Sequence, residues 1–159
     1  MREFRILSEV DVMCRPERLY EFVTTPNNWV GTHPSTRAVR GETGSPKGLG
    51  ERWIEVIEAP GGRRFEAEWR VTKADAPKLW EIQADNFGGL PATVTITYVL
   101  TEGRDGRAGA SGGTHFQRDM VTALPDSFPV SDGLRAALTS RESHDTYLRA
   151  IKEEVESRG

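Results

Sequence analysis

The sequence predicts an α+β domain in which a curved antiparallel sheet of about seven strands packs against a long C-terminal helix, with two short helices after the first strand. Segments that alternate between apolar and polar residues follow one another with short turns between them, as in an antiparallel meander. A helical segment separates the first of these strands from the others. The segment from Leu134 to Arg158 contains neither Gly nor Pro, so it has room for a helix of roughly 35 Å. This order of elements is typical of a cup for a small molecule.

The N-terminal elements follow from local patterns. A strand is expected from Phe4 to Cys14, where apolar residues recur at every second position with one break at Ser8. A helix is expected from Pro16 to Val23, because proline suits the first helical position and Pro26 stops the run. The segment from Asn27 to Val30 predicts a second, shorter helical turn.

The rest of the sheet is expected in six further segments, each bounded by Gly, Pro, Asn or Asp: Thr36 to Glu42, Glu51 to Glu58, Arg64 to Lys73, Leu79 to Asn86, Thr93 to Thr101 and Thr114 to Leu124. The glycine pairs Gly61-Gly62 and Gly88-Gly89 can take positive φ, which favours tight turns between antiparallel neighbours. The glycine-rich segment from Glu102 to Gly113 predicts a long hairpin loop.

Length and composition narrow the class of protein. A chain of 159 residues is expected to form one domain, residues 1–159, with a sizeable core. The formal net charge of −3, without runs of like charge, argues against nucleic acid as a partner. Because Cys14 is the single cysteine, the three histidines are scattered and nucleotide-binding motifs are missing, we expect no disulfide, no metal and no cofactor. The single cysteine fits a reducing cytoplasm, and the sequence contains no recognisable signal peptide or membrane span. The expected state is a monomer or a homodimer.

Two polar residues fall in the apolar stripe of the predicted C-terminal helix. At 100° per residue this stripe contains Leu134, Ala137, Arg141, His144, Leu148, Ile151 and Val155. An unpaired guanidinium in a dry core costs several kcal/mol, so Arg141 and His144 predict a cavity that holds water or ligand. The alternative is that Arg141 extends to the rim and His144 is hydrogen-bonded inside the protein.

The strands direct several aromatic residues and one cation to the interior. Alternation places Phe65, Trp69, Trp80, Tyr98, Phe116 and Met120 on inward faces. Arg118 shares its face with Phe116 and Met120, so it is expected to point inward and to anchor an anionic oxygen. The alternative is an edge position from which Arg118 bends outward. The direction of Trp53 stays open.

Two residues are expected near the mouth of the cavity. His33 lies in the corner after the short helices, where it suits an acid, a base or a hydrogen-bond donor near neutral pH. The structural alternative is a histidine bonded to the backbone. Phe128, between two prolines, is expected either to close over the ligand or to pack against the last helix.

Four segments of the chain resemble the SRPBCC (START-like) superfamily, in its polyketide cyclase/dehydrase-like branch. They are RPERLYEFVTTPNNW, GLGERW, FEAEWRVTKADAPKLWEI and GGTHFQRDM. The resemblance covers nearly the whole chain and implies a helix-grip fold, in which the sheet wraps the C-terminal helix and leaves a tunnel. It also implies a bacterial-type cytoplasmic protein that binds a mainly apolar, polyketide-like or aromatic molecule.

The resemblance leaves three functions open. The first is cyclisation and dehydration by proton transfer, with Arg118 and Arg141 as anion anchors and His144 or His33 as the proton shuttle. The second is a non-catalytic carrier for a lipid-like or aromatic ligand, and the third is a module that binds a chaperone partner. For either small-molecule function, the expected ligand-binding wall comprises Phe65, Trp69, Trp80, Tyr98, Phe116, Met120, Leu148 and Phe128.

Overall fold

The computed structural model describes residues 1–103 and 113–158. Its elements are β1 Arg2–Val12, α1 Pro16–Val23, η1 Pro26–Trp29, β2 Thr36–Arg40, β3 Arg52–Glu58, β4 Arg64–Asp75, β5 Leu79–Ala84, η2 Phe87–Gly89, β6 Thr93–Glu102, β7 Thr114–Leu124, α3 Asp132–Thr139 and α4 Glu142–Ser157. The predicted strands and short helices are confirmed, with ends that differ by a few residues at most. Most of the predicted loop from Glu102 to Gly113 lies outside the described residues.

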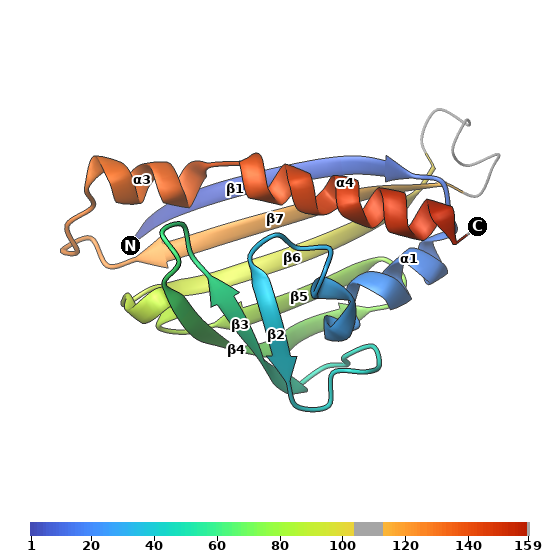
Figure 1. Ribbon diagram of the computed structural model, residues 1–159, viewed down its shortest axis with the longest axis horizontal. Coiled ribbons are helices and arrows are strands. Elements are labelled where there is room, and N and C mark those ends of the chain that lie inside the picture. Colours follow the sequence, from blue (N-terminus) through green and yellow to red (C-terminus); the bar gives the residue numbers. More distant parts are fainter. Residues whose placement is uncertain (104–112, 159) are drawn as a thin grey trace.

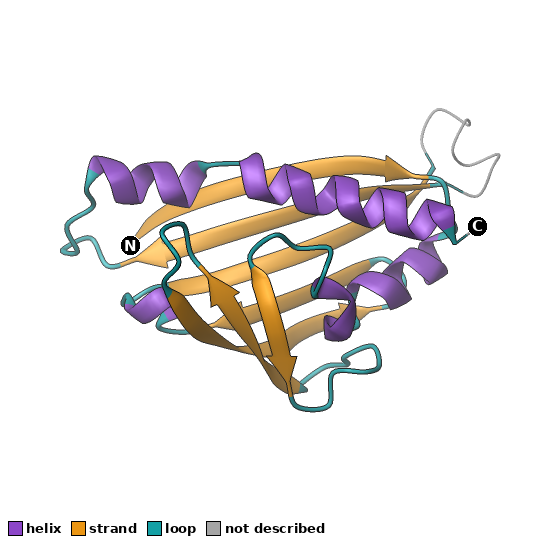
Figure 2. Cartoon of the chain, viewed as in Figure 1, coloured by secondary structure: helices purple, strands orange, loops and turns teal. Residues whose placement is uncertain are grey.

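The strands form one antiparallel sheet in the order β1-β7-β6-β5-β4-β3-β2. The first and last strands are neighbours, since Arg2 pairs with Leu124 and Val12 with Thr114. The sheet curves around α4, with α1 and η1 at the C-terminal end of that helix (Figures 1 and 2). The predicted helix-grip architecture is therefore confirmed.

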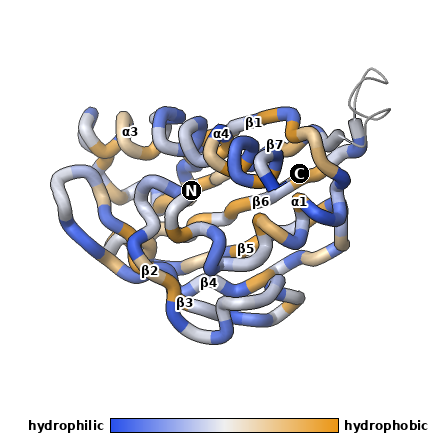
Figure 3. Tube along the Cα trace, turned by 45° about the vertical axis from the view of Figure 1, so that its right-hand side comes forward, coloured by the Kyte–Doolittle hydropathy of each residue, from blue (hydrophilic) through white to orange (hydrophobic). Residues whose placement is uncertain are grey.

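Side-chain alternation along the strands separates the interior from the surface. Along β4, Ala67, Trp69 and Val71 are buried while Glu66 and Glu68 are exposed, and the same alternation of apolar and polar residues is visible along the strands in Figure 3. Trp53, whose direction the sequence leaves open, is buried and stacks on Trp80 with 5.8 Å between the ring centroids. The concave side of the sheet is thus lined with large aromatic rings.

The predicted C-terminal helix is divided into two. Ser131 caps α3, as its sequence suggests, by accepting a hydrogen bond from the backbone N–H of Leu134. Ser140 then takes an extended conformation, with φ −74° and ψ 128°, and α4 begins at Glu142. This break interrupts the helical phase, so a stripe drawn through one continuous helix is wrong around it: Arg141 is exposed.

A smaller apolar cluster holds α3 and its preceding loop on the sheet. Its buried members are Phe4, Ala92 and Leu124, and Phe128 and Leu138 pack against them. Phe128 therefore contributes to packing at this end of the molecule, as the second of its two predicted roles expects.

Candidate functional site

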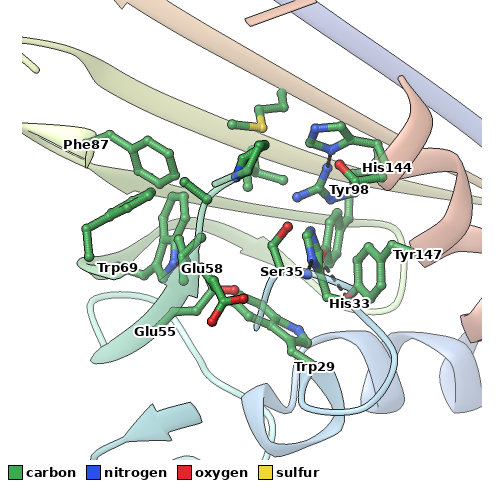
Figure 4. Close-up of a pocket in the computed structure, with 18 residues that line it drawn as sticks. Trp29, His33, Ser35, Glu55, Glu58, Trp69, Phe87, Tyr98, His144 and Tyr147 are labelled. Carbon is green, nitrogen blue, oxygen red and sulfur yellow. Dashed lines mark hydrogen bonds between the residues drawn. The ribbon is translucent and has the colours of Figure 1, made fainter. Parts of the chain in front are cut away.

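A cavity of about 160 Å³ lies between the concave face of the sheet and α4. Much of its wall is apolar and comes from separate elements: Trp29, Ile57, Phe65, Trp69, Phe87 and Ile96. An apolar cavity of about 150 Å³ holds one benzene molecule. The inner cavity therefore has the size of a single aromatic ring, with polar groups along part of its wall (Figure 4).

Arg118 brings a positive charge to this wall. It lies on β7 opposite Tyr98 of β6, is only 4% exposed, and faces inward as strand alternation predicts. Its guanidinium carbon lies 5.5 Å from the centroid of the Tyr147 ring. Within the described residues it forms no ion pair, and its Nε has no hydrogen-bond partner.

Arg118 also determines which nitrogen of His144 carries the proton. Its Nη1 lies 2.5 Å from Nδ1 of His144. A guanidinium has only donors, so Nδ1 must accept and the neutral imidazole must carry its hydrogen on Nε2. His33 reaches the same tautomer by another contact, because its Nδ1 accepts a hydrogen bond of 3.1 Å from the backbone N–H of Ser35.

Both histidines are neutral at physiological pH. Burial, followed by the charge of Arg118, lowers the pKa of His144 to about 3. The same two causes lower the pKa of His33 well below the usual 6.5. The ring centroids of these two histidines are 6.2 Å apart, and His33 lies 4.7 Å from Tyr147. The site thus has two neutral imidazoles, each with an Nε2–H group that can donate a hydrogen bond.

Two acidic residues line the cavity, Glu58 and the more deeply buried Glu55, and sequence reasoning missed both. Glu55 is the one inside the cavity. It lies on β3 and is 5% exposed. Its Oε2 accepts a hydrogen bond of 2.5 Å from Thr36, and its Oε1 accepts one of 2.9 Å from the indole N–H of Trp69. Burial raises the pKa of Glu55, although both hydrogen bonds and the charge of Arg118 oppose that shift. The available signal was parity, because Glu55 shares its face with Trp53 and Ile57.

Two tyrosines complete the polar part of the wall. The hydroxyl oxygens of Tyr98 and Tyr147 are 3.4 Å apart. Burial raises the pKa of both phenols, that of Tyr147 well above 10, so both stay protonated. Tyr147 was also missed, although it follows His144 by three residues on α4 and therefore shares its helix face.

Seven of the twelve predicted site residues line the cavity: Arg118, His33, His144, Phe65, Trp69, Tyr98 and Met120. Trp80, Phe116 and Leu148 are buried in the adjoining core, and Phe128 belongs to the smaller apolar cluster. Arg141 does not reach the cavity. Its side chain is 64% exposed and pairs with Asp145 at 3.4 Å, because the break before α4 turns it to the surface.

A larger outer cavity of about 550 Å³ adjoins the inner one. The two share wall residues that include Ser35, Ala59, Ser143 and His144. The hairpin between β3 and β4 and the junction of α3 with α4 surround this outer space. A ligand longer than one ring can therefore extend from the inner cavity past Ser35 and Ser143.

The described residues show neither a metal site nor a membrane-spanning helix. Residues 1–103 and 113–158 contain no group of three or more His, Cys, Asp or Glu side chains placed to hold a metal ion. Within the same residues, the helices are too short or too polar to cross a membrane.

Comparisons with known proteins agree with this architecture. The sequence model of a family described as "Polyketide cyclase / dehydrase and lipid transport" matches residues 3–156. Penitrem biosynthesis cluster 1 protein I of Penicillium ochrochloron is 28% identical over 161 residues, which cover 98% of this chain and 99% of the relative.

Solved structures share the fold at low sequence identity. A START superfamily protein from Mycobacterium smegmatis superposes with a TM-score of 0.70 and 13% identity, over 98% of this chain and 99% of that one. A point mutant of norcoclaurine synthase from Thalictrum flavum, in complex with a transition-state analogue, superposes with a TM-score of 0.69 and 15% sequence identity. The match covers 99% of this chain and 96% of that one. Because the family model matches nearly the whole length of this chain, the chain belongs to the polyketide cyclase / dehydrase and lipid transport family, as its SRPBCC resemblance predicts.

Proposed function

We propose that this protein binds a mainly apolar, polyketide-like or aromatic molecule by a carbonyl or enolate oxygen, and that it catalyses ring closure with loss of water by proton transfer. The observation that carries the proposal is Arg118, a buried guanidinium in an apolar cavity. Its side-chain contacts are with uncharged groups, His144 and the phenol of Tyr98.

The state of Arg118 supports an oxygen-bearing ligand. A buried cation is costly unless a charged or strongly polar partner compensates its lost hydration. Neither His144 nor the ring of Tyr147 carries a negative charge, and Nε is unpartnered within the described residues. The carboxylate of Glu55 faces Arg118 from across the cavity but forms no ion pair with it within the described residues. An enolate, phenolate or polarised carbonyl oxygen can accept from the guanidinium and supply the missing compensation.

The two cavities restrict how such a ligand is held. The inner cavity of about 160 Å³ accepts the reacting ring or the chain segment that becomes one, and the outer cavity accepts the remainder. Ligand sites for molecules of drug size are usually about 300 to 1,000 Å³. A long polyketide therefore fits only if its reacting end enters the inner cavity and the rest lies outside.

The chemistry proceeds without oxidation or reduction. A base takes a proton from the carbon beside the carbonyl. The C–H electron pair forms a C=C bond, and the π pair of the C=O bond moves to the oxygen, which becomes the enolate oxygen. The guanidinium of Arg118 and the Nε2–H groups of the histidines stabilise this oxygen as its charge develops. The enolate carbon attacks a second carbonyl of the same molecule, and the alkoxide that forms takes up the proton that the base removed. A second C–H proton and the new hydroxyl group then leave as water, which forms a C=C bond.

The relatives support small-molecule chemistry. One belongs to a penitrem biosynthesis cluster and another is a synthase that binds a transition-state analogue. The family description also names lipid transport. A carrier is therefore the second candidate, in which Arg118 holds an acidic head group without reaction.

The first test is binding of 4-nitrophenol, whose neutral and anionic forms have different absorption spectra, against nitrobenzene as an uncharged analogue. The native protein is expected to prefer the anion by about tenfold or more, since hydrogen bonds to charged groups are worth about 1.5–3 kcal/mol. R118M should lose this preference. The matched control is R52M, because Arg52 is exposed and pairs with Glu68 on the outer face. Equal anion preference in R118M and the native protein would refute the anchoring role.

A further inference from the structure

We infer that Glu55 is the base that removes the substrate proton, and that His33 and His144 act as hydrogen-bond donors to the developing oxyanion. This assignment rests on the proposed function above and gives each polar group of the same cavity a distinct role. It moves proton removal from the two histidines to a residue on the opposite wall.

The cavity has few groups that can accept a proton. The guanidinium of Arg118 has no lone pair to offer, and the Nδ1 atoms of both histidines are already acceptors. The phenols of Tyr98 and Tyr147 hold their protons. Among the ionisable groups that line the cavity, the carboxyl groups of Glu55 and Glu58 remain.

Glu58 is poorly suited to proton removal. Its oxygens accept hydrogen bonds from Arg37 at 3.4 Å and from Arg64 at 3.0 Å. These two arginines lower the pKa of Glu58, which makes its carboxylate a weaker base. Glu55 forms no ion pair within the described residues, and that leaves it as the stronger base of the two.

The carboxylate of Glu55 is held in one orientation and can still accept a proton. The hydroxyl of Thr36 and the indole N–H of Trp69 each donate to a different carboxylate oxygen. A carboxylate oxygen has two lone-pair sites, so each oxygen keeps one for a substrate proton. Such preorganisation by buried neighbours is what a catalytic base requires.

The surroundings of Glu55 also increase its basicity. Burial raises its pKa, and a carboxylate with a raised pKa accepts a proton more readily. The charged or titratable groups that face it are Arg118 of β7, Tyr98 of β6 and Tyr147 of α4. Arg118 opposes the shift, but the net direction remains upward.

The arrangement in space separates the base from the donors. In Figure 4, Glu55 lies with Trp29 and Trp69 at one end of the group, whereas His144 and Tyr147 lie at the other. A ligand between them directs a C–H bond toward Glu55 and its carbonyl oxygen toward Arg118. The C–H bond then breaks and an O–H bond forms on Glu55. The C–H electron pair forms a C=C bond, and the π pair of the C=O bond moves to the carbonyl oxygen.

The experiment measures deuterium uptake by 2-indanone in D₂O, followed by NMR. This apolar ketone has acidic C–H bonds beside its carbonyl and carries one aromatic ring. The native protein is expected to accelerate exchange over buffer. E55Q should lose at least about 100-fold of that acceleration, the range typical of general acid–base catalysis, while E55D should retain part of it. The control E68Q, on the exposed face of β4, should exchange like the native protein.

Binding of 4-nitrophenolate distinguishes the ways in which the proposal can fail. E55Q that binds the anion but does not exchange 2-indanone supports the assignment, because the cavity and Arg118 are then intact. E55Q that exchanges at the native rate overturns the role of Glu55 and leaves the proposed function standing. A native protein that binds the anion without exchange overturns both catalysis and the role of Glu55, and leaves a carrier.

Discussion

At the scale of single residues, Arg118 sets the properties of its neighbours. Because a guanidinium only donates, its contact with His144 fixes the tautomer of that ring. Its charge contributes to the lowered pKa of both His144 and His33. The same charge opposes the raised pKa of Glu55. Arg118 therefore keeps the two histidines neutral, as hydrogen-bond donors, and limits the rise in the pKa of Glu55.

The buried state of His144 predicts acid sensitivity. Its pKa is about 3 in the folded protein and near 6.5 in the unfolded chain, so the unfolded chain binds more protons between these values. Stability should therefore fall as the pH drops from 6.5 toward 3, by up to about 5 kcal/mol at 1.36 kcal/mol per pKa unit. In urea unfolding measured across this pH range, the free energy of unfolding of H144N should fall less steeply with decreasing pH than that of the native protein. An unchanged slope in H144N would contradict the assignment.

Thr36 is expected to act as a positioning residue for Glu55. T36V keeps the shape of the side chain but removes the hydrogen bond to Oε2. That bond favours the ionised carboxylate, so its loss should raise the pKa of Glu55 further. The acid limb of the pH–rate profile for 2-indanone exchange should move to higher pH. A merely structural role would lower the rate without moving the limb.

At the scale of elements, strands were predicted better than the last helix. Strand alternation has a period of two, so the face shared with Phe116 predicted an inward Arg118, with an outward edge position as the alternative. Helix faces depend on accumulated phase, and the single extended residue Ser140 separates α3 from α4. This is why Arg141 was assigned to the interior while its real position is on the surface. Ser140 does not indicate such a break in the sequence, because serine is tolerated in helices.

The break predicts that Arg141 is dispensable for ligand binding. R141A removes an exposed ion pair with Asp145, which is worth at most about 1 kcal/mol of stability. Affinity for 4-nitrophenolate should stay within about twofold of the native value, in contrast to R118M. Isothermal titration calorimetry on both variants would decide the matter. A loss in R141A as large as in R118M would return Arg141 to the site.

Glu55 shows why part of the site could not be predicted from the sequence. Glu55 has the parity of Trp53 and Ile57. An acidic residue among these apolar ones argues, in the sequence alone, against assigning that face of the strand to the interior. Its burial becomes understandable only with Thr36 and Trp69 in place as donors. These partners come from β2 and β4, so their contacts depend on strand pairing that one sequence does not reveal.

At the scale of the whole molecule, the fold determines the size of the site. Local patterns predicted the order of strands and helices and the position of a cavity beneath α4. The volume of about 160 Å³ depends on the curvature of the sheet and on the rotamers of aromatic side chains. Neither follows from alternation. The sequence thus predicted a cavity with Arg118 in its wall. The single-ring size of that cavity follows only from the assembled sheet.

These dimensions predict a size limit that one side chain controls. Met120 lines the inner cavity on the same face of β7 as Arg118, so M120A should enlarge the cavity while the anion anchor stays. The native protein should bind 4-nitrophenolate more tightly than 4-phenylphenolate, because a second ring exceeds the inner volume. M120A should reverse this order, at a stability cost of up to about 2–5 kcal/mol for a methionine truncation. M13A is the matched control, since Met13 is exposed and far from the cavity wall. An unchanged preference in M120A would mean that the ligand does not enter the inner cavity, because the truncation can alter selectivity only for a ligand that meets this wall.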